Sequence, residues 1–179
     1  SYRIGGQPLT GDPEPFGLLT RRADALGSTT YSYFPLGAPG ALSLEVLDGP
    51  LMGDQIEYRY DELGRMSRRS VGDVVSEWSF DSLGRVVQET NALGVFEINY
   101  DGNSQRVASV EYPNGQEVTF EYSDVAQGSS LQAISNRWLP TAATISRYEY
   151  TWSAAGTLVT LREVIAGEAT TNMAYAHDS

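Results

Sequence analysis

The sequence predicts an all-β fold, in which short strands and tight turns alternate as an antiparallel meander. Pairs of aromatic residues separated by one position recur along the chain, and side chains two positions apart point to the same face of a strand. Eighteen glycines and eleven tyrosines are typical of many strands joined by many turns. No stretch combines a helical apolar period with caps at both ends, so we expect no long helix.

The repeat is clearest in the middle of the chain. Tyr58-Arg-Tyr60-Asp61-Glu-Leu-Gly64-Arg65 is followed 20 residues later by Trp78-Ser-Phe80-Asp81-Ser-Leu-Gly84-Arg85. A further 20 residues on, the chain reads Tyr100-Asp101. Looser copies contain Phe120 with Tyr122, and Trp152 with Gly156, and the chain ends inside another copy that contains His177. Such a period indicates a repeat architecture.

Each repeat predicts two kinds of turn. Asp61 is expected to accept hydrogen bonds from the backbone N–H groups that follow it, and Gly64 to supply the positive φ of a type I turn with a bulge. A second turn motif, Asp24-Ala-Leu-Gly27, recurs as Asn91-Ala-Leu-Gly94. Asn114-Gly115 predicts a two-residue hairpin. Each period therefore holds two strands and two turns.

Alternation of apolar and polar residues marks strands over 42–46, 107–112 and 116–122. Residues 128–143, with Trp138 and Pro140, are expected to form a longer loop that interrupts the repeat. Because sheets twist, we expect the meander to form a curved, spiralling strip rather than a flat one.

Composition narrows the range of functions. The chain of 179 residues is 41% hydrophobic and has no cysteine, which excludes disulfides and thiolate metal sites. It carries 12 basic residues, all arginine, against 23 acidic ones, for a net charge of −11. A surface this acidic repels phosphate backbones and makes nucleic-acid binding unfavourable. The acidity serves either solubility or the attraction of a basic partner.

The recurring Tyr-x-Tyr-Asp-x-x-Gly-Arg resembles the YD repeat of Rhs proteins, which is shared with the C component of insecticidal toxin complexes and with teneurins. The resemblance covers residues 21–179 and is closest at 58–66 and 78–86. It implies a fragment of a hollow β-shell that encloses a carboxy-terminal toxin polypeptide in a secreted or cell-surface protein. The autoproteolytic segment of bacterial members has no counterpart, since Asp12-Pro13 precedes the repeats.

The resemblance divides the chain into an irregular segment, 1–20, and a repeat region, 21–179, that is truncated within its last repeat. About six repeats are too few to close a shell, so we expect the rest of a longer repeat chain and its polypeptide cargo as partners. Within this region, the residues expected to build the repeats are Tyr58, Tyr60, Asp61, Gly64, Arg65, Trp78, Phe80, Asp81, Gly84, Arg85, Tyr100, Asp101, Asn114, Gly115, Phe120, Tyr122, Trp152 and Gly156.

A search for catalytic groups favours a structural protein over an enzyme. His177 stands at an aromatic position of the repeat, so we interpret it as structural. The spacing of Asp61 and Asp81 matches the repeat period and favours turn formation over glycosidase or calcium chemistry. The sequence has no nucleophile elbow or phosphate-binding glycine loop. We expect no catalytic residue, cofactor or metal.

The main alternative is a carbohydrate- or receptor-binding adhesion module. Stacked aromatic rings also suit sugar binding, and Trp138, in the expected loop, is the best single candidate for a ligand-binding aromatic. Arg65, Arg85 and Arg106 are expected to pair with the aspartates of their own turns. Unpaired strands at the two edges of the sheet would favour edge-to-edge self-association.

Overall fold

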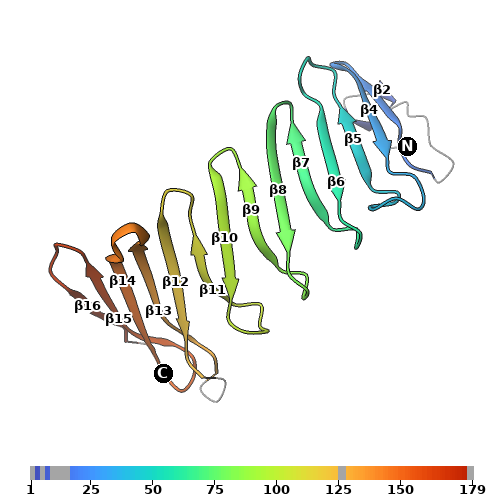
Figure 1. Ribbon diagram of the computed structural model, residues 1–179. Helices are drawn as coiled ribbons and strands as arrows, with labels where there is room; N and C mark the ends of the chain where they lie inside the picture. The colour runs from blue at the N-terminus through green and yellow to red at the C-terminus, as the bar shows by residue number, and fades with distance from the viewer. Residues whose placement is uncertain (1–2, 5–6, 9–16, 125–127, 177–179) are drawn as a thin grey trace. The chain divides into compact units, whose positions relative to one another are not determined.

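The computed structural model describes residues 3–4, 7–8, 17–124 and 128–176 and confirms the all-β prediction. Fourteen strands form one antiparallel meander in which every strand pairs with its neighbours in the chain (Figure 1). A separate two-stranded ladder joins β1 (Arg3–Ile4) and β2 (Gln7–Pro8). The strands of the meander are β3 (Arg21–Asp24), β4 (Gly27–Tyr33), β5 (Leu44–Asp48), β6 (Ile56–Tyr60), β7 (Met66–Val71), β8 (Val74–Phe80), β9 (Val86–Asn91), β10 (Gly94–Tyr100), β11 (Val107–Glu111), β12 (Gln116–Tyr122), β13 (Leu131–Trp138), β14 (Ala143–Trp152), β15 (Leu158–Ile165) and β16 (Thr171–Ala174).

The chain divides into two compact units. The first unit consists of Ser1–Ser79 with Glu89–Ala92, and the second of Phe80–Gln88 with Leu93–Ser179. Within each unit, the substantial contacts between strands join strands that are consecutive in the chain. Each hairpin is therefore stabilised by its immediate neighbours, as in other repeat proteins.

Neither unit encloses a conventional hydrophobic core among the residues that the structure describes. Ala133, at 1% exposure, is the one buried hydrophobic residue there, and no large side chain is fully buried. Most aromatic and aliphatic side chains of the strands are half-buried against their cross-strand neighbours. In place of a central core, stability comes from backbone ladders and from cross-strand side-chain pairs.

The register of the second unit separates two faces of the sheet. One face is apolar, since Ile98 pairs with Val110, which pairs with Val118 on the next strand. The aromatic pairs of β12 and β14 continue this apolar face. The other face, which we call the charged face, carries Glu97, Glu111 and Glu117 in the same three strands and arginines further along. The alternation expected over 107–112 and 116–122 is confirmed in this unit.

Two local expectations were wrong. The expected loop over 128–143 contains an eight-residue strand, β13, and a short 3-10 helix, Leu139–Thr141. β13 pairs along its length with both β12 and β14. The Asn114-Gly115 hairpin is a three-residue turn: the N–H of Tyr112 donates to the carbonyl of Gln116, and Gly115 alone of the central residues has a positive φ. The proline at 113 fixes a negative φ at the start of this turn and favours the longer form.

The 3-10 helix is the only helix in the described part of the chain, and no helix there is long and apolar enough to span a membrane.

Candidate functional site

The Asp-x-x-Gly-Arg turn is built as its sequence predicts. Oδ1 of Asp61 accepts hydrogen bonds from the N–H groups of Leu63 and Arg65, at 3.0 and 2.9 Å. The guanidinium of Arg65 contacts Oδ2 of the same carboxylate at 2.6 Å. Gly64, at φ +76°, closes the turn through its N–H to the carbonyl of Asp61. The predicted pairing of arginine and aspartate within one turn is confirmed.

Two other copies of the turn keep this geometry, whereas the turn from Asp101 to Arg106 is one residue longer. Asp81 and Arg85 repeat the same contacts, with distances of 2.7 to 2.9 Å. Ser153 replaces the aspartate in the turn that ends at Thr157, and its hydroxyl accepts the N–H groups of Ala155 and Thr157 at 3.2 Å. A hydroxyl therefore supports this turn without the charge of the aspartate.

Hydrogen bonding lowers the pKa of both turn aspartates. For Asp81, the N–H of Arg85 is the largest cause, and the Arg85 guanidinium and the N–H of Leu83 add to it. For Asp61, partial burial acts in the opposite direction, but the hydrogen bonds from Arg65 outweigh it and the pKa is still lowered. The carboxylate form is the one the turn stabilises.

An arginine–tyrosine contact joins successive repeats of the second unit; we call it the clasp. The Arg85 guanidinium lies 4.3 Å from the centroid of the Tyr100 ring, and the Tyr100 hydroxyl donates back to the carbonyl of Val86 at 2.9 Å. Arg106 and Tyr122 repeat the arrangement at 5.0 Å, with the hydroxyl on the carbonyl of Val107 at 2.9 Å. Arg85 also donates to the carbonyls of Gly102 and Ser104 in the next turn. One arginine thus connects its own turn, the next turn and the next aromatic ring.

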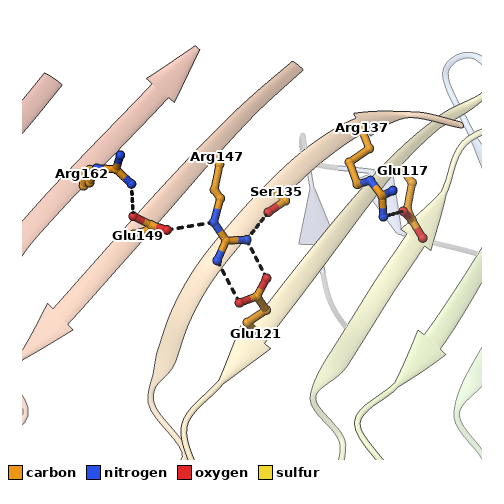
Figure 2. Close-up of polar contacts among 7 residues, drawn as sticks. All are labelled: Glu117, Glu121, Ser135, Arg137, Arg147, Glu149 and Arg162. Atoms are coloured by element: carbon orange, nitrogen blue, oxygen red, sulfur yellow. Dashed lines mark hydrogen bonds and ion pairs between the residues drawn. The ribbon is translucent and has the colours of Figure 1, made fainter. Parts of the chain in front are cut away.

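The charged face carries a network of ion pairs across β12 to β15, which we call the charge ladder (Figure 2). Arg147 is at its centre and contacts both oxygens of Glu121, at 2.6 and 2.9 Å. Its Nε donates to Glu149 at 3.0 Å, and Glu149 in turn accepts from Arg162 at 2.6 Å. Arg147 also donates to the hydroxyl of Ser135 at 2.7 Å. Bidentate contacts of this kind fix geometry more firmly than single ion pairs.

The charge ladder shifts the pKa values of its members and covers the small residues below. The hydrogen bond from Arg147 lowers the pKa of Glu121, and those from Arg162 and Arg147 lower the pKa of Glu149. The hydrogen bonds with Glu121 and Glu149 raise the pKa of Arg147. Ser135 is 6% exposed. The long arginine and glutamate side chains therefore lie over the sheet and shield its backbone.

A third contact joins neighbouring turns of the second turn type, in which a glycine of one turn lies against a proline of the next. Gly94 has φ +123°, and a Cβ placed on it would lie 2.5 Å from Cβ of Pro113 in the neighbouring turn. Gly27 and Pro50 repeat this arrangement in the first unit, with φ +137° and 2.6 Å. Only glycine permits this approach at these two positions.

The remaining predicted repeat residues lie in strands or turns. Tyr58 and Tyr60 are in β6, Trp78 and Phe80 in β8, and Phe120 and Tyr122 in β12. Trp138 ends β13 and is 38% exposed. Asn114 caps its own turn by accepting the N–H of Gln116 at 3.0 Å. His177 lies outside the described residues.

No group of three or more potential metal-ligating side chains occurs within 3–4, 7–8, 17–124 and 128–176.

Sequence reasoning missed the charge ladder. Its members, Glu121, Arg147, Glu149 and Arg162, come from three strands and follow no repeat spacing. Their register depends on bulges, such as the one between Glu121 and Tyr122, that no sequence motif announces. The charged residues at 147 and 149, which are separated by one position, were the one available signal.

No family model matches the sequence, and no curated protein matches it. The fold, by contrast, resembles solved structures. A chain of the crystal structure of TcdB2-TccC3 without its hypervariable C-terminal region matches 93% of this chain at a TM-score of 0.67 and 16% identity. A chain of TcdB2-TccC3-Cdc42 matches 93% of this chain at a TM-score of 0.66 and 17% identity. A chain of the Tc holotoxin pore of Photorhabdus luminescens gives the same three values.

At this level of identity the similarity shows a shared fold. The chain spans 9 to 10% of the length of these solved chains, so the match concerns a short stretch of much larger proteins. The all-β repeat architecture expected from the sequence is confirmed, and its fold is similar to that of these TcdB2-TccC3 chains.

Proposed function

We propose that this chain is a scaffold segment of an Rhs-type β-shell, which encloses a carboxy-terminal toxin polypeptide in a secreted or cell-surface protein. The observation that carries the proposal is the backbone match over 93% of the chain to TcdB2-TccC3 structures. The aromatic-Asp-x-x-Gly-Arg repeat, read independently from the sequence, supports the same conclusion.

The proposed role is mechanical. A continuous hydrogen-bonded sheet separates an enclosed polypeptide from solvent and proteases, and neither catalytic residues nor a cofactor take part. The clasps at Arg85 and Arg106 fix two repeats of the second unit to the repeats that follow them. Such nearest-neighbour coupling lets a thin sheet keep its form without a thick core.

The two faces suit different surroundings. On the charged face, the arginines and glutamates of the charge ladder pair with one another, and this face is suited to contact with water. On the apolar face, aromatic side chains such as Phe96 and Phe120 are half-buried and retain exposed apolar area. We assign the apolar face to the enclosed polypeptide, since contact with a cargo would remove that area from water.

Limited proteolysis of the native parent protein tests the proposal. Its intact mass is measured first, and digestion of the native protein is compared with digestion after denaturation. We expect a parent several times longer than this chain, with a carboxy-terminal segment that resists protease until the shell is unfolded. A parent scarcely longer than 179 residues, or a carboxy-terminal segment cut equally fast before and after denaturation, contradicts the proposal.

A further inference from the structure

A groove of about 800 Å³ opens in the second unit, where β13 begins and β14 ends. Its walls include the side chains of Ser130, Gln132, Thr151 and Trp152, together with the turn over 153–156. The volume falls within the range of roughly 300–1,000 Å³ that is typical of small-molecule sites. Every residue that lines it is uncharged.

Trp152 gives the groove a rigid aromatic wall. Its indole N–H donates to the carbonyl of Leu131 at 2.6 Å, which fixes the ring. The ring also rests on Tyr150, with centroids 6.3 Å apart and planes inclined by 31°. The side chain remains 36% exposed. A flat apolar surface is thus held in place before any ligand arrives, which reduces the entropy cost of binding.

Two polar side chains beside the ring are available to a ligand. Neither the Gln132 amide nor the Ser130 hydroxyl makes a hydrogen bond to another described residue. The amide offers both donors and an acceptor, and the hydroxyl offers one donor and two lone pairs. The hydroxyls of Thr151 and Ser153 are already bonded, to Thr160 and Thr157, at 2.6 Å.

This combination selects a class of ligand. The uncharged walls, on a chain of net charge −11, disfavour phosphates and other anions. Without a carboxylate in the groove, a cation finds no counter-charge there. A neutral sugar fits because its C–H face can cover an aromatic ring while its hydroxyls meet amide and hydroxyl groups at the edge.

We propose that this groove binds a short neutral oligosaccharide, with the sugar face on Trp152 and sugar hydroxyls on Gln132 and Ser130. This proposal does not depend on the proposed shell function, and its test is independent of the test of that function. It also moves the aromatic contact from Trp138, which the sequence favoured, to a tryptophan that the groove holds rigid.

Saturation-transfer NMR on the full 179-residue chain tests the site, with maltohexaose, cellohexaose and chitohexaose as separate probes and adenosine as a flat non-sugar control. We expect transfer from the protein to the sugar C–H protons for at least one probe, with a dissociation constant in roughly the millimolar range. Adenosine should show weaker transfer than that sugar.

Three variants locate the binding. Trp152→Ala is expected to weaken binding by at least about tenfold, as loss of an aromatic anchor does. Gln132→Ala, on an exposed side chain, is expected to weaken it by about threefold to tenfold through the lost hydrogen bond. Trp138→Ala is the matched control and should change affinity by less than about twofold. Far-UV circular dichroism checks that each variant keeps its strands.

The proposal is overturned if none of the three sugars receives saturation. It is also overturned if adenosine binds more tightly than every sugar. The same holds if sugar binding survives both Gln132→Ala and Trp152→Ala, because the ligand would then occupy another surface.

Discussion

Replacing Gly94 by alanine should destabilise the chain more than the same replacement at Gly156. Both glycines have positive φ, +123° and +78°, so both substitutions place an L-residue in a region it avoids. The positive φ costs an alanine about 1–2 kcal/mol. The lower entropy of the unfolded chain with alanine offsets about 0.4–1 kcal/mol of this cost. A Cβ at Gly156 has no neighbour within 4 Å, whereas one at Gly94 lies 2.5 Å from Cβ of Pro113.

The clash adds a second cost at Gly94. Overpacking at a tight contact typically costs about 1–3 kcal/mol. We therefore expect roughly 1 kcal/mol of destabilisation for Gly156→Ala and about 2–4 kcal/mol for Gly94→Ala. Urea unfolding of the 179-residue chain, followed by circular dichroism, measures both free energies.

A double-mutant cycle isolates the contact itself. Pro113→Gly removes the Cβ and Cγ that Gly94→Ala would meet at 2.5 and 3.2 Å, and leaves Cα, at 3.9 Å, as the nearest remaining atom of residue 113. The cost of Gly94→Ala should then fall by about 1–2 kcal/mol in the Pro113→Gly background. Equal losses for the Gly94 and Gly156 variants, or no coupling to residue 113, would refute the packing argument.

Two further predictions concern the clasp and the charge ladder. Tyr100→Phe keeps the ring over its arginine but loses the hydrogen bond to the Val86 carbonyl, so unfolding free energy should drop by about 0.5–1.5 kcal/mol; Tyr148→Phe is the control and should change little. Because the pKa values of Glu121 and Glu149 lie below their ordinary 4.5, their contribution to stability is present above about pH 4.5 and is lost as pH falls through the folded-state values. Urea midpoints recorded from about pH 7 to about pH 3 should therefore decline at the acidic end. The decline should be shallower in Arg147→Gln, and a decline of equal steepness in that variant would contradict the assignment.

The sequence was sufficient to predict most strands of the repeats and one kind of turn, but not β13. Aromatic pairs two positions apart predict strands, and an Asp-x-x-Gly unit predicts a turn. Both are local signals, and the turn forms through local hydrogen bonds such as that from the N–H of Leu63 to Asp61. Only one of the contacts that Arg85 makes in the clasp could be predicted from the sequence. The pairing of Arg85 with its own aspartate is local, but its contact with Tyr100 depends on the register of two further strands.

The region after Tyr122 shows where sequence reasoning fails. β13 has no Tyr-x-Tyr-Asp signature, and Pro140 with Trp138 suggested a loop. The strand exists because β12 and β14 lie on either side of it and supply partners for its backbone. Tertiary pairing overrides weak local preference in such central strands. The saccharide groove was missed for the same reason, since it forms where β13 begins.

The dependence of each hairpin on its immediate neighbours alone has a consequence for how such a chain is made and moved. A polypeptide whose substantial strand contacts join consecutive strands needs no distant segment to complete each hairpin. Strands can therefore add one after another as the chain leaves a ribosome. The same order run backwards allows the sheet to be unzipped from one end under a pulling force, each hairpin yielding in turn.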